Sequence, residues 1–248
     1  MKTLINLFVV LFSAFSLTVA ANAAENNGKI RVLKVSSSDY RGDYDNAMAS
    51  DPWKGFNLAM FKFNNALDQY LLEPLARGYR YSVPQWGRDR VANLFNNIGE
   101  TTNFLNSALQ GDIEGVFRSF WRFVINTTFG VGGINDVAGG FGLAEKDKDF
   151  SQTLALYGLG SGPYLVVPFV GPSSPRDFVG TMADRASDPT SYVESPGSYI
   201  IGGANGIQTR ENILDVTDDL KKNSFDLYSS YKSSYLQHRK KKVLDTLE

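Results

Sequence analysis

The sequence predicts an all-α fold built as a single domain. Apolar side chains recur at helical spacing in several segments, and residues that start helices, such as Asp51-Pro52 and Asp112, precede those segments. The sequence shows no clear apolar–polar alternation over five or more residues, the pattern of a half-buried strand. No internal repeat is visible, and 248 residues fit one large domain.

The N-terminus has the features of a cleaved signal peptide. Lys2 is the only charged side chain before Glu25, the stretch between them is largely apolar, and Ala21-Asn22-Ala23 is a small-x-small cleavage pattern. We therefore predict a signal peptide over residues 1–23, cleaved between Ala23 and Ala24. A transmembrane anchor is the alternative, which the short apolar run disfavours. Residues 24–50 are polar, which predicts a flexible leader.

The first helix is expected to have Asp51 as its N-cap and Pro52 in its first position, and to end at Glu73-Pro74. A second helix is expected from Pro84, and a short third one ends at Gly111. The apolar residues of the first helix share one face: Phe56, Met60, Phe63, Leu67 and Leu71.

The fourth helix, capped by Asp112, has a wider apolar sector than one core face requires. Trp121 and Phe123 widen the stripe, while Arg118 and Arg122 interrupt it. The stripe itself consists of Ile113, Val116, Phe117, Phe120 and Val124.

Two segments are rich in helix breakers. Residues 129–143 contain six glycines and one charged residue, Asp136, and are expected to form a hairpin. Residues 158–177 contain four glycines and four prolines around an apolar run, Tyr164–Val170, which excludes a helix or a strand of a central sheet. That run needs an apolar cover, which is either the protein's own core or a lipid phase.

Helices are expected again over residues 147–157, 175–183, 198–216 and 224–247, with a short helical piece at Asp188-Pro189. We interpret the basic cluster Arg239–Lys242 as a solvated helix end, with contact to anionic lipid as the alternative.

Composition excludes several classes of function. The formal net charge is −1, which argues against a nucleic-acid partner, and the chain has no cysteine and one histidine, His238. A zinc site, a thiol nucleophile or a Ser-His-Asp triad is hard to build from this inventory. Ser161 lacks the flanking glycines of a nucleophile elbow, and Pro163 stands where a dinucleotide fingerprint needs glycine. We therefore predict no enzyme activity, no cofactor and no metal.

Several motifs occur in a fixed order along residues 51–239. They are Asp51-Pro52-Trp53-Lys54-Gly55-Phe56-Asn57, Gly130-Val131-Gly132-Gly133-Ile134-Asn135-Asp136-Val137-Ala138, Gly158-Leu159-Gly160-Ser161-Gly162-Pro163-Tyr164, Gly171-Pro172-Ser173 with Arg176-Asp177, and Tyr235-Leu236-Gln237-His238-Arg239. With these motifs, residues 51–239 resemble the MlaA/VacJ family of outer-membrane lipoproteins of phospholipid transport. Residues 240–248 would then be a C-terminal tail.

The resemblance implies a ring-like bundle of amphipathic helices in the inner leaflet of the outer membrane. A central channel would remove mislocalised phospholipids from the outer leaflet and pass them to a soluble periplasmic carrier, with a trimeric porin as scaffold. The candidate channel or hinge residues are Phe129, Gly130, Val131, Gly132, Gly133, Ile134, Asp136, Val137 and Phe141. The candidate membrane-contact residues are Phe117, Phe120, Trp121, Tyr164, Leu165, Val167 and Phe169.

The chain departs from the family pattern in three respects. The acylated cysteine is absent, Lys54 and Leu58 replace a common glutamate and arginine, and Leu227 replaces a common proline. The missing cysteine keeps a second function open, that of a soluble periplasmic lipid-binding or adaptor protein. The glycines of residues 129–143 also have two interpretations, as hinges of a movable channel wall or as close-packing positions in a tight connection.

Overall fold

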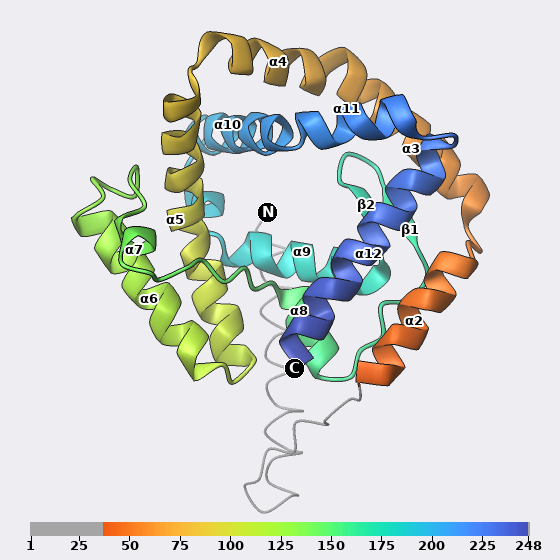
Figure 1. Cartoon of the computed structure of the whole chain (residues 1–248), viewed down its shortest axis with the longest axis horizontal. Coiled ribbons are helices and arrows are strands. Elements are labelled where there is room, and N and C mark those ends of the chain that lie inside the picture. The colour runs from red at the N-terminus through yellow and green to blue at the C-terminus, as the bar shows by residue number, and fades with distance from the viewer. Residues whose placement is uncertain (1–36, 248) are drawn as a thin grey trace, which may run out of the picture.

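Helices make up most of the described chain, residues 37–247, in the computed structural model (Figure 1). This arrangement confirms the all-α prediction. Two three-residue strands form the one small antiparallel hairpin among these residues, with Leu165 opposite Ser173. In chain order the elements are α2 (Ser37–Ala49), α3 (Lys54–Leu67), the π-helical turn η1 (Asp68–Leu72), α4 (Glu73–Ser82), α5 (Gln85–Leu109), α6 (Ile113–Thr128), α7 (Val137–Gly140), α8 (Phe150–Leu156), β1 (Leu165–Val167), β2 (Gly171–Ser173), α9 (Pro175–Ser187), the 3₁₀ turn η2 (Pro189–Tyr192), α10 (Gly197–Asn212), α11 (Leu214–Asn223) and α12 (Leu227–Leu247).

The elements follow one another around a ring (Figure 1). In that view α4 forms the upper rim, α5 the left side, α9 the lower side and α3 the right side, with the β-hairpin and α12 just inside α3. Helix α10 packs against α4 inside the upper rim, and α6 packs against α5 on the outside. The ring-like architecture implied by the family resemblance is therefore present.

The predicted flexible leader is wrong for its C-terminal part. Ser37–Ala49 forms helix α2, which packs against α12 and buries Tyr40 and Tyr44 on one face. The guanidinium of Arg176 donates a hydrogen bond of 2.6 Å to the Tyr44 hydroxyl, so the helix is held by polar as well as apolar contacts. The predicted signal peptide, Ala23 and Ala24, and residues 24–36 lie outside the described residues.

The first long helix also differs from prediction at both ends. Asp51 does not cap it: α3 begins at Lys54, and the Asp51 carboxylate instead accepts hydrogen bonds from Asn57 and from Tyr228 on α12. The helix does not end at Glu73-Pro74 either. The π-helical turn before Glu73 widens the helix, which leaves room for Pro74 in the first turn of α4.

Other helix boundaries are closer to prediction. The second and third predicted helices are one continuous helix, α5, and Gly111 follows its end at a φ of 70°. Asp112 caps α6 as predicted, with its carboxylate accepting a hydrogen bond of 2.9 Å from the Gly115 amide. Residues 198–216, expected as one helix, divide between α10 and α11 at Ile213.

Residues 240–247 do not form a separate tail, because α12 continues to Leu247 and buries Val243 in the core. Its basic cluster is mostly engaged within the protein, although Lys241 is exposed. Arg239 is buried against Asp149, while Lys240 pairs with Asp45 and Lys242 with Asp147, both at 2.6 Å. Internal pairing uses most of this charge.

The apolar core is small and lies where α2, α12, α8 and β1 meet. It contains Tyr44, Tyr164, Val166, Leu236 and Val243 among others. Elsewhere in the described chain many of the buried side chains are polar or charged, including Glu100, Arg122, Asn126 and Arg210. No helix within residues 37–247 is both long enough and apolar enough to span a bilayer.

Candidate functional site

Helix α6 buries its polar face and exposes its apolar face, the reverse of a helix on the surface of a water-soluble protein. Its buried positions are Gly115, Ser119, Arg122 and Asn126, which recur at helical spacing and form one polar stripe. Its large apolar side chains face outward, and Phe117 is 60% exposed. The wide apolar sector seen in the sequence is therefore an outer surface: Ile113, Phe117, Phe120, Trp121 and Phe123.

The polar stripe of α6 binds α5 and the glycine-rich segment. Arg122 donates to the carboxylate of Glu100, both side chains being almost completely buried, and also to the Leu143 carbonyl. A second nitrogen of Arg122 lies 3.3 Å from Asp136, and the Asn126 side chain accepts a hydrogen bond of 2.8 Å from the Ala138 amide. Burial alone would raise the pKa of Asp136, but hydrogen bonds from Gly139 and Asn126 and the Arg122 charge keep it below its usual range.

The predicted channel or hinge residues lie together in one connection between α6 and α8. Phe129, Val131 and Phe141 are largely exposed there, and Ile134 is exposed to a lesser degree. Val137 begins the short helix α7, which Asp136 caps. The segment thus extends the outward apolar surface of α6.

Two of the glycines in this segment are sites of close packing. A Cβ on Gly130 would lie 2.3 Å from the carbonyl oxygens of Asn126 and Asn135, and one on Gly133 would lie 2.5 Å from the side chain of Asn97. A Cβ on Gly132 would meet nothing within 4 Å, although its φ is 71°. Val131, at a φ of 57°, is in a left-handed conformation that a β-branched residue rarely adopts.

The predicted membrane-contact residues divide into two groups. Phe117, Phe120, Trp121 and Phe169 are exposed, and Leu165 and Val167 are half-buried. Tyr164 is completely buried, so its prediction is wrong: its ring packs edge-on against Tyr228, inside the small core. Alternation along β1 directs Val166 inward and its neighbours outward.

The outward apolar surface is larger than predicted. Helices α3 to α5, the turn η1 and helix α10 also expose large apolar side chains. The predicted apolar face of α3 divides: Phe56 and Phe63 are exposed, whereas Met60 packs against the core. Together with α6, the exposed side chains of the segment from Trp53 to α5 form what we call the apolar periphery: Trp53, Phe56, Phe63, Tyr70, Leu71, Leu75, Tyr81 and Trp86. Tyr199 and Ile200 are exposed on α10, which lies inside the upper rim (Figure 1).

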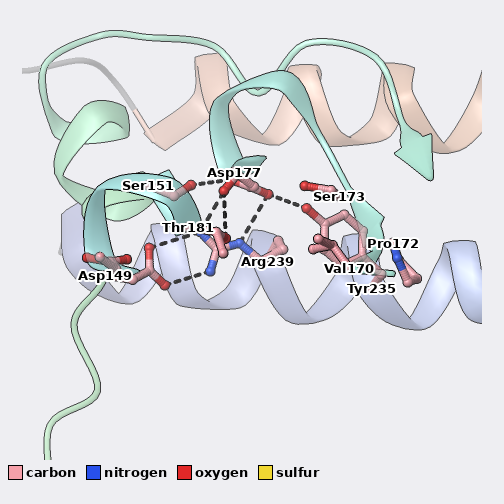
Figure 2. A pocket seen from close by; sticks show the side chains of 10 residues that line it. Asp149, Ser151, Val170, Pro172, Ser173, Asp177, Thr181, Tyr235 and Arg239 are labelled. Carbon is pink, nitrogen blue, oxygen red and sulfur yellow. Dashed lines mark hydrogen bonds and ion pairs between the residues drawn. The ribbon is translucent and has the colours of Figure 1, made fainter. Parts of the chain in front are cut away.

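Three cavities adjoin one another among the helices. The hairpin cavity, of about 180 Å³, has a mainly apolar wall that includes Phe61, Leu72 and Val166. The arginine cavity, of about 170 Å³, lies beside it and shares Val170 and Pro172 (Figure 2). The third, of about 340 Å³ and lined by α5, α9 and α10, we call the α5–α9 cavity. It shares Asp149 and Asp184 with the arginine cavity.

An ion-pair network forms the wall of the arginine cavity (Figure 2). Arg239 lies 2.7 Å from Asp149 and 3.2 Å from Asp177, and the Tyr235 hydroxyl donates to Asp177. Burial opposes ionisation of Asp177, but the charges of Arg239 and Arg176 outweigh it and hold its pKa below the usual range. All the members are engaged with one another, so the network joins α8, α9 and α12.

Asp184 differs from these carboxylates. It accepts hydrogen bonds from the Asn106 side chain at 2.9 Å and the Phe150 amide at 3.0 Å. Burial raises the pKa of Asp184 to about 6, because these neutral donors offset only part of the desolvation.

The described residues contain no group of three or more His, Asp or Glu side chains that could hold a metal ion. The Ser161 hydroxyl donates to the neighbouring Gly162 carbonyl, and His238 is exposed on α12. The candidate site is therefore a set of polar and apolar cavities within an apolar periphery.

Comparisons with known proteins agree with this architecture. The family described as MlaA lipoprotein matches residues 49–242. The protein named intermembrane phospholipid transport system lipoprotein MlaA in Escherichia coli (strain K12) is 38% identical over 192 residues, which are 76% of each chain. Its namesake in Haemophilus influenzae is 31% identical over 96% of this chain and 90% of its own.

An uncharacterised protein of Rickettsia bellii is 37% identical over 78% of this chain and 76% of its own length. A solved structure reported under the heading "Structural basis for maintenance of bacterial outer membrane lipid asymmetry" superposes with a TM-score of 0.68 at 37% identity. The match covers 78% of this chain and 99% of that one. From its matched residues and its relatives, the chain belongs to the MlaA lipoprotein family.

Proposed function

We propose that this protein moves phospholipids between membranes, as a ring embedded in the periplasmic leaflet of the outer membrane, and thereby maintains lipid asymmetry. The observation that carries the proposal is the inverted burial of α6, with a polar stripe inside and aromatic side chains outside. Such a surface is costly in water and suits a helix lying in a lipid leaflet.

The three adjoining cavities supply an amphipathic passage for the lipid. The apolar wall of the hairpin cavity suits acyl chains, and the polar walls of the arginine and α5–α9 cavities suit a headgroup. Irregular backbone is tolerated at membrane depth where it is buried in protein or lines a wet cavity. The β-hairpin, whose tip residues line two of the cavities, meets this condition.

Retention in the membrane would follow from the apolar periphery. Moving one large side chain from water to hydrocarbon contributes about 1.5–3 kcal/mol. Four side chains of α6 and its loop, Phe117, Phe120, Trp121 and Phe129, are 46–71% exposed, so together they would contribute roughly 3–7 kcal/mol. That is comparable to the hold of a single acyl chain, and the other exposed apolar side chains would add to it. We also propose the predicted signal peptide as the route of export, a trimeric porin as scaffold and a soluble periplasmic carrier as recipient.

Residues 129–143 are our candidate for a movable part of the passage wall. The support is local: their aromatic side chains are exposed, and several backbone angles lie in the left-handed region. Motion would have to keep Gly130 and Gly133 in place, since neither has room for a Cβ. The glycine we expect to act as a hinge is therefore Gly132.

Fractionation of cells separates this function from that of a soluble adaptor. We expect the wild-type protein to stay with the envelope after extraction at high salt and high pH, because apolar side chains hold it. Deletion of the gene should increase phospholipid in the outer leaflet of intact cells. Recovery of the wild type in the soluble periplasmic fraction, with unchanged surface lipid on deletion, would favour the adaptor.

A further inference from the structure

The α5–α9 cavity has an excess of negative charge. Its wall includes the carboxylates of Glu145, Asp147, Asp184 and Asp188, against one cation, Lys148. Lys148 itself lies 3.5 Å from Asp112, so it is already shared with a carboxylate outside the cavity. The whole chain, by contrast, has a formal net charge of only −1. A cavity lined by one sign of charge concentrates ligands of the other sign.

Internal ion pairs leave two of these carboxylates without a cation. Asp147 pairs with Lys242, and Glu145 lies 3.9 Å from Arg122. Asp184 bonds only the neutral donors already described, and Asp188 bonds the amide and hydroxyl of Thr190. Among the described residues, neither Asp184 nor Asp188 has a basic side chain in salt-bridge contact.

The same wall has apolar side chains, Phe95 and Ile98 from α5, beside these carboxylates. A ligand that fits therefore combines a positive polar group with apolar parts. Phospholipids with an ethanolamine headgroup have this combination, since their ammonium can donate hydrogen bonds to a carboxylate. A glycerol headgroup offers only hydroxyls, so nothing offsets the repulsion of its phosphate charge.

We propose that the α5–α9 cavity selects phospholipids whose headgroup carries an ammonium group, with Asp184 and Asp188 as the carboxylates that receive it. The inference rests on the proposed function and names the substrate class that the passage favours. Asp184 also lines the arginine cavity, so it stands on the route between the two polar compartments.

Selection should weaken in acid. The groups around Asp184 are of both signs. Asp149, before α8, and Asp188, after α9, are acidic, Arg239 and Lys242 of α12 are basic, and Asn106 of α5 is neutral. Because burial raises the pKa of Asp184 to about 6, the carboxylate is ionised at pH 7.5 and neutral at pH 5. Its attraction for an ammonium group disappears over that interval.

The test uses the full-length protein, purified in mild detergent and incubated with an equimolar mixture of phosphatidylethanolamine and phosphatidylglycerol of identical acyl chains. Retained lipids are quantified by mass spectrometry after repurification. At pH 7.5 we expect enrichment of phosphatidylethanolamine by about two- to fivefold, the range for a partly exposed ion pair. Asp184→Asn should lower the enrichment, and pH 5 should lower it in the wild type.

Two further variants make the result decisive. Asp219→Asn removes the same charge from an exposed position on α11 and should leave the enrichment unchanged. Asn205→Lys adds a cation to the cavity at an exposed position and should reverse the preference, even if Asp184→Asn were to fold poorly. Lipids on the apolar periphery contribute equally to every variant, so differences between variants report the cavity.

Equal retention of the two lipids by the wild type, or an unaltered ratio in Asn205→Lys, would overturn the selection while leaving lipid transport standing. Retention of neither lipid by the wild type would overturn both proposals.

Discussion

Replacement of Arg122 by methionine should destabilise the ring more than any neighbouring surface change on α6. Its side chain is 3% exposed, and that of its partner Glu100 is completely buried. In Arg122→Met, Glu100 keeps only the Asn103 amide, at 3.3 Å, and Asp136 loses a charge partner. An uncompensated buried carboxylate costs about 3–5 kcal/mol.

For a chain of this size that cost lowers the melting temperature by roughly 6–20 °C, at about 2–4 °C per kcal/mol. The assay is thermal unfolding in detergent, followed by the helical circular dichroism signal. The matched control is Arg118→Met, one turn earlier on the same helix. Arg118 pairs with Glu114, which is 72% exposed, and donates to the Ala144 carbonyl at 3.3 Å, so its loss should cost about 1 kcal/mol.

The double variant Arg122→Met/Glu100→Gln separates the ion pair from packing. It removes the buried charge, and the side-chain amide introduced at position 100 can still accept a hydrogen bond from Asn103, so we expect the double variant to melt above Arg122→Met. If the double variant loses as much as both single variants added together, or if Arg122→Met melts with the Arg118→Met control, the buried pair does not hold α5 to α6 and the reasoning fails.

Three other predictions follow from the same contacts. Gly133→Ala should lower abundance and melting temperature, because its Cβ would overlap Asn97. Gly132→Ala has room for its Cβ, so it should fold and, if Gly132 is a hinge, alter surface phospholipid in intact cells. Equal abundance of the two variants would contradict the packing role of Gly133. Tyr164→Phe should be neutral or slightly stabilising, since the buried hydroxyl lacks a hydrogen-bond partner within the described residues, and a large loss of stability would count against it. Because the folded state raises the pKa of Asp184 to about 6 from an ordinary value near 4, its contribution to stability is lost as pH rises through 6. The melting temperature gained between pH 7 and pH 5 should therefore be smaller in Asp184→Asn than in the wild type, and an equal gain would contradict the assignment.

Local signals predicted much of the secondary structure. The Asp112 cap and the break at Gly111 depend on neighbours within a few residues, and both are found where expected. Asp51 misled the prediction because its carboxylate has a distant partner, Tyr228, that a local pattern does not show. The polar composition of residues 37–49 likewise concealed two tyrosines four residues apart that anchor α2.

The site was harder to predict, because the spacing of apolar residues identifies the apolar face of a helix but not whether that face is buried. On α6 the width of the apolar sector was the available signal, and it indicated an outer surface correctly. On α3 the stripe predicted one apolar face but not what covers it: Phe56 and Phe63 are exposed, whereas Met60 packs against the core. The cavities depend on contacts such as Arg239 with Asp177, which are 62 residues apart and have no local signature.

A ring with an apolar periphery needs another source of cohesion between its helices. In the proposed leaflet, lipid would solvate the outer side chains as well as a neighbouring helix would, so the hydrophobic effect would not draw helices together there. Ion pairs and hydrogen bonds instead connect neighbouring helices at their contacts, which we call joints. Arg210 of α10 lies 2.5 Å from Asp68, Arg80 of α4 lies 2.8 Å from Glu211, and Arg239 of α12 bonds Asp149 beside α8.

Both these joints and the wall of the proposed passage are polar, because most of their buried charges have partners of opposite charge. A buried arginine is stable only if its carboxylate partners are placed to meet it, which fixes the register of one helix against the next. The arginine cavity is lined by one such joint, so the groups that close the ring at α12 also form the wall a headgroup would pass. Cohesion of the ring and the chemistry of the proposed passage would therefore depend on the same side chains.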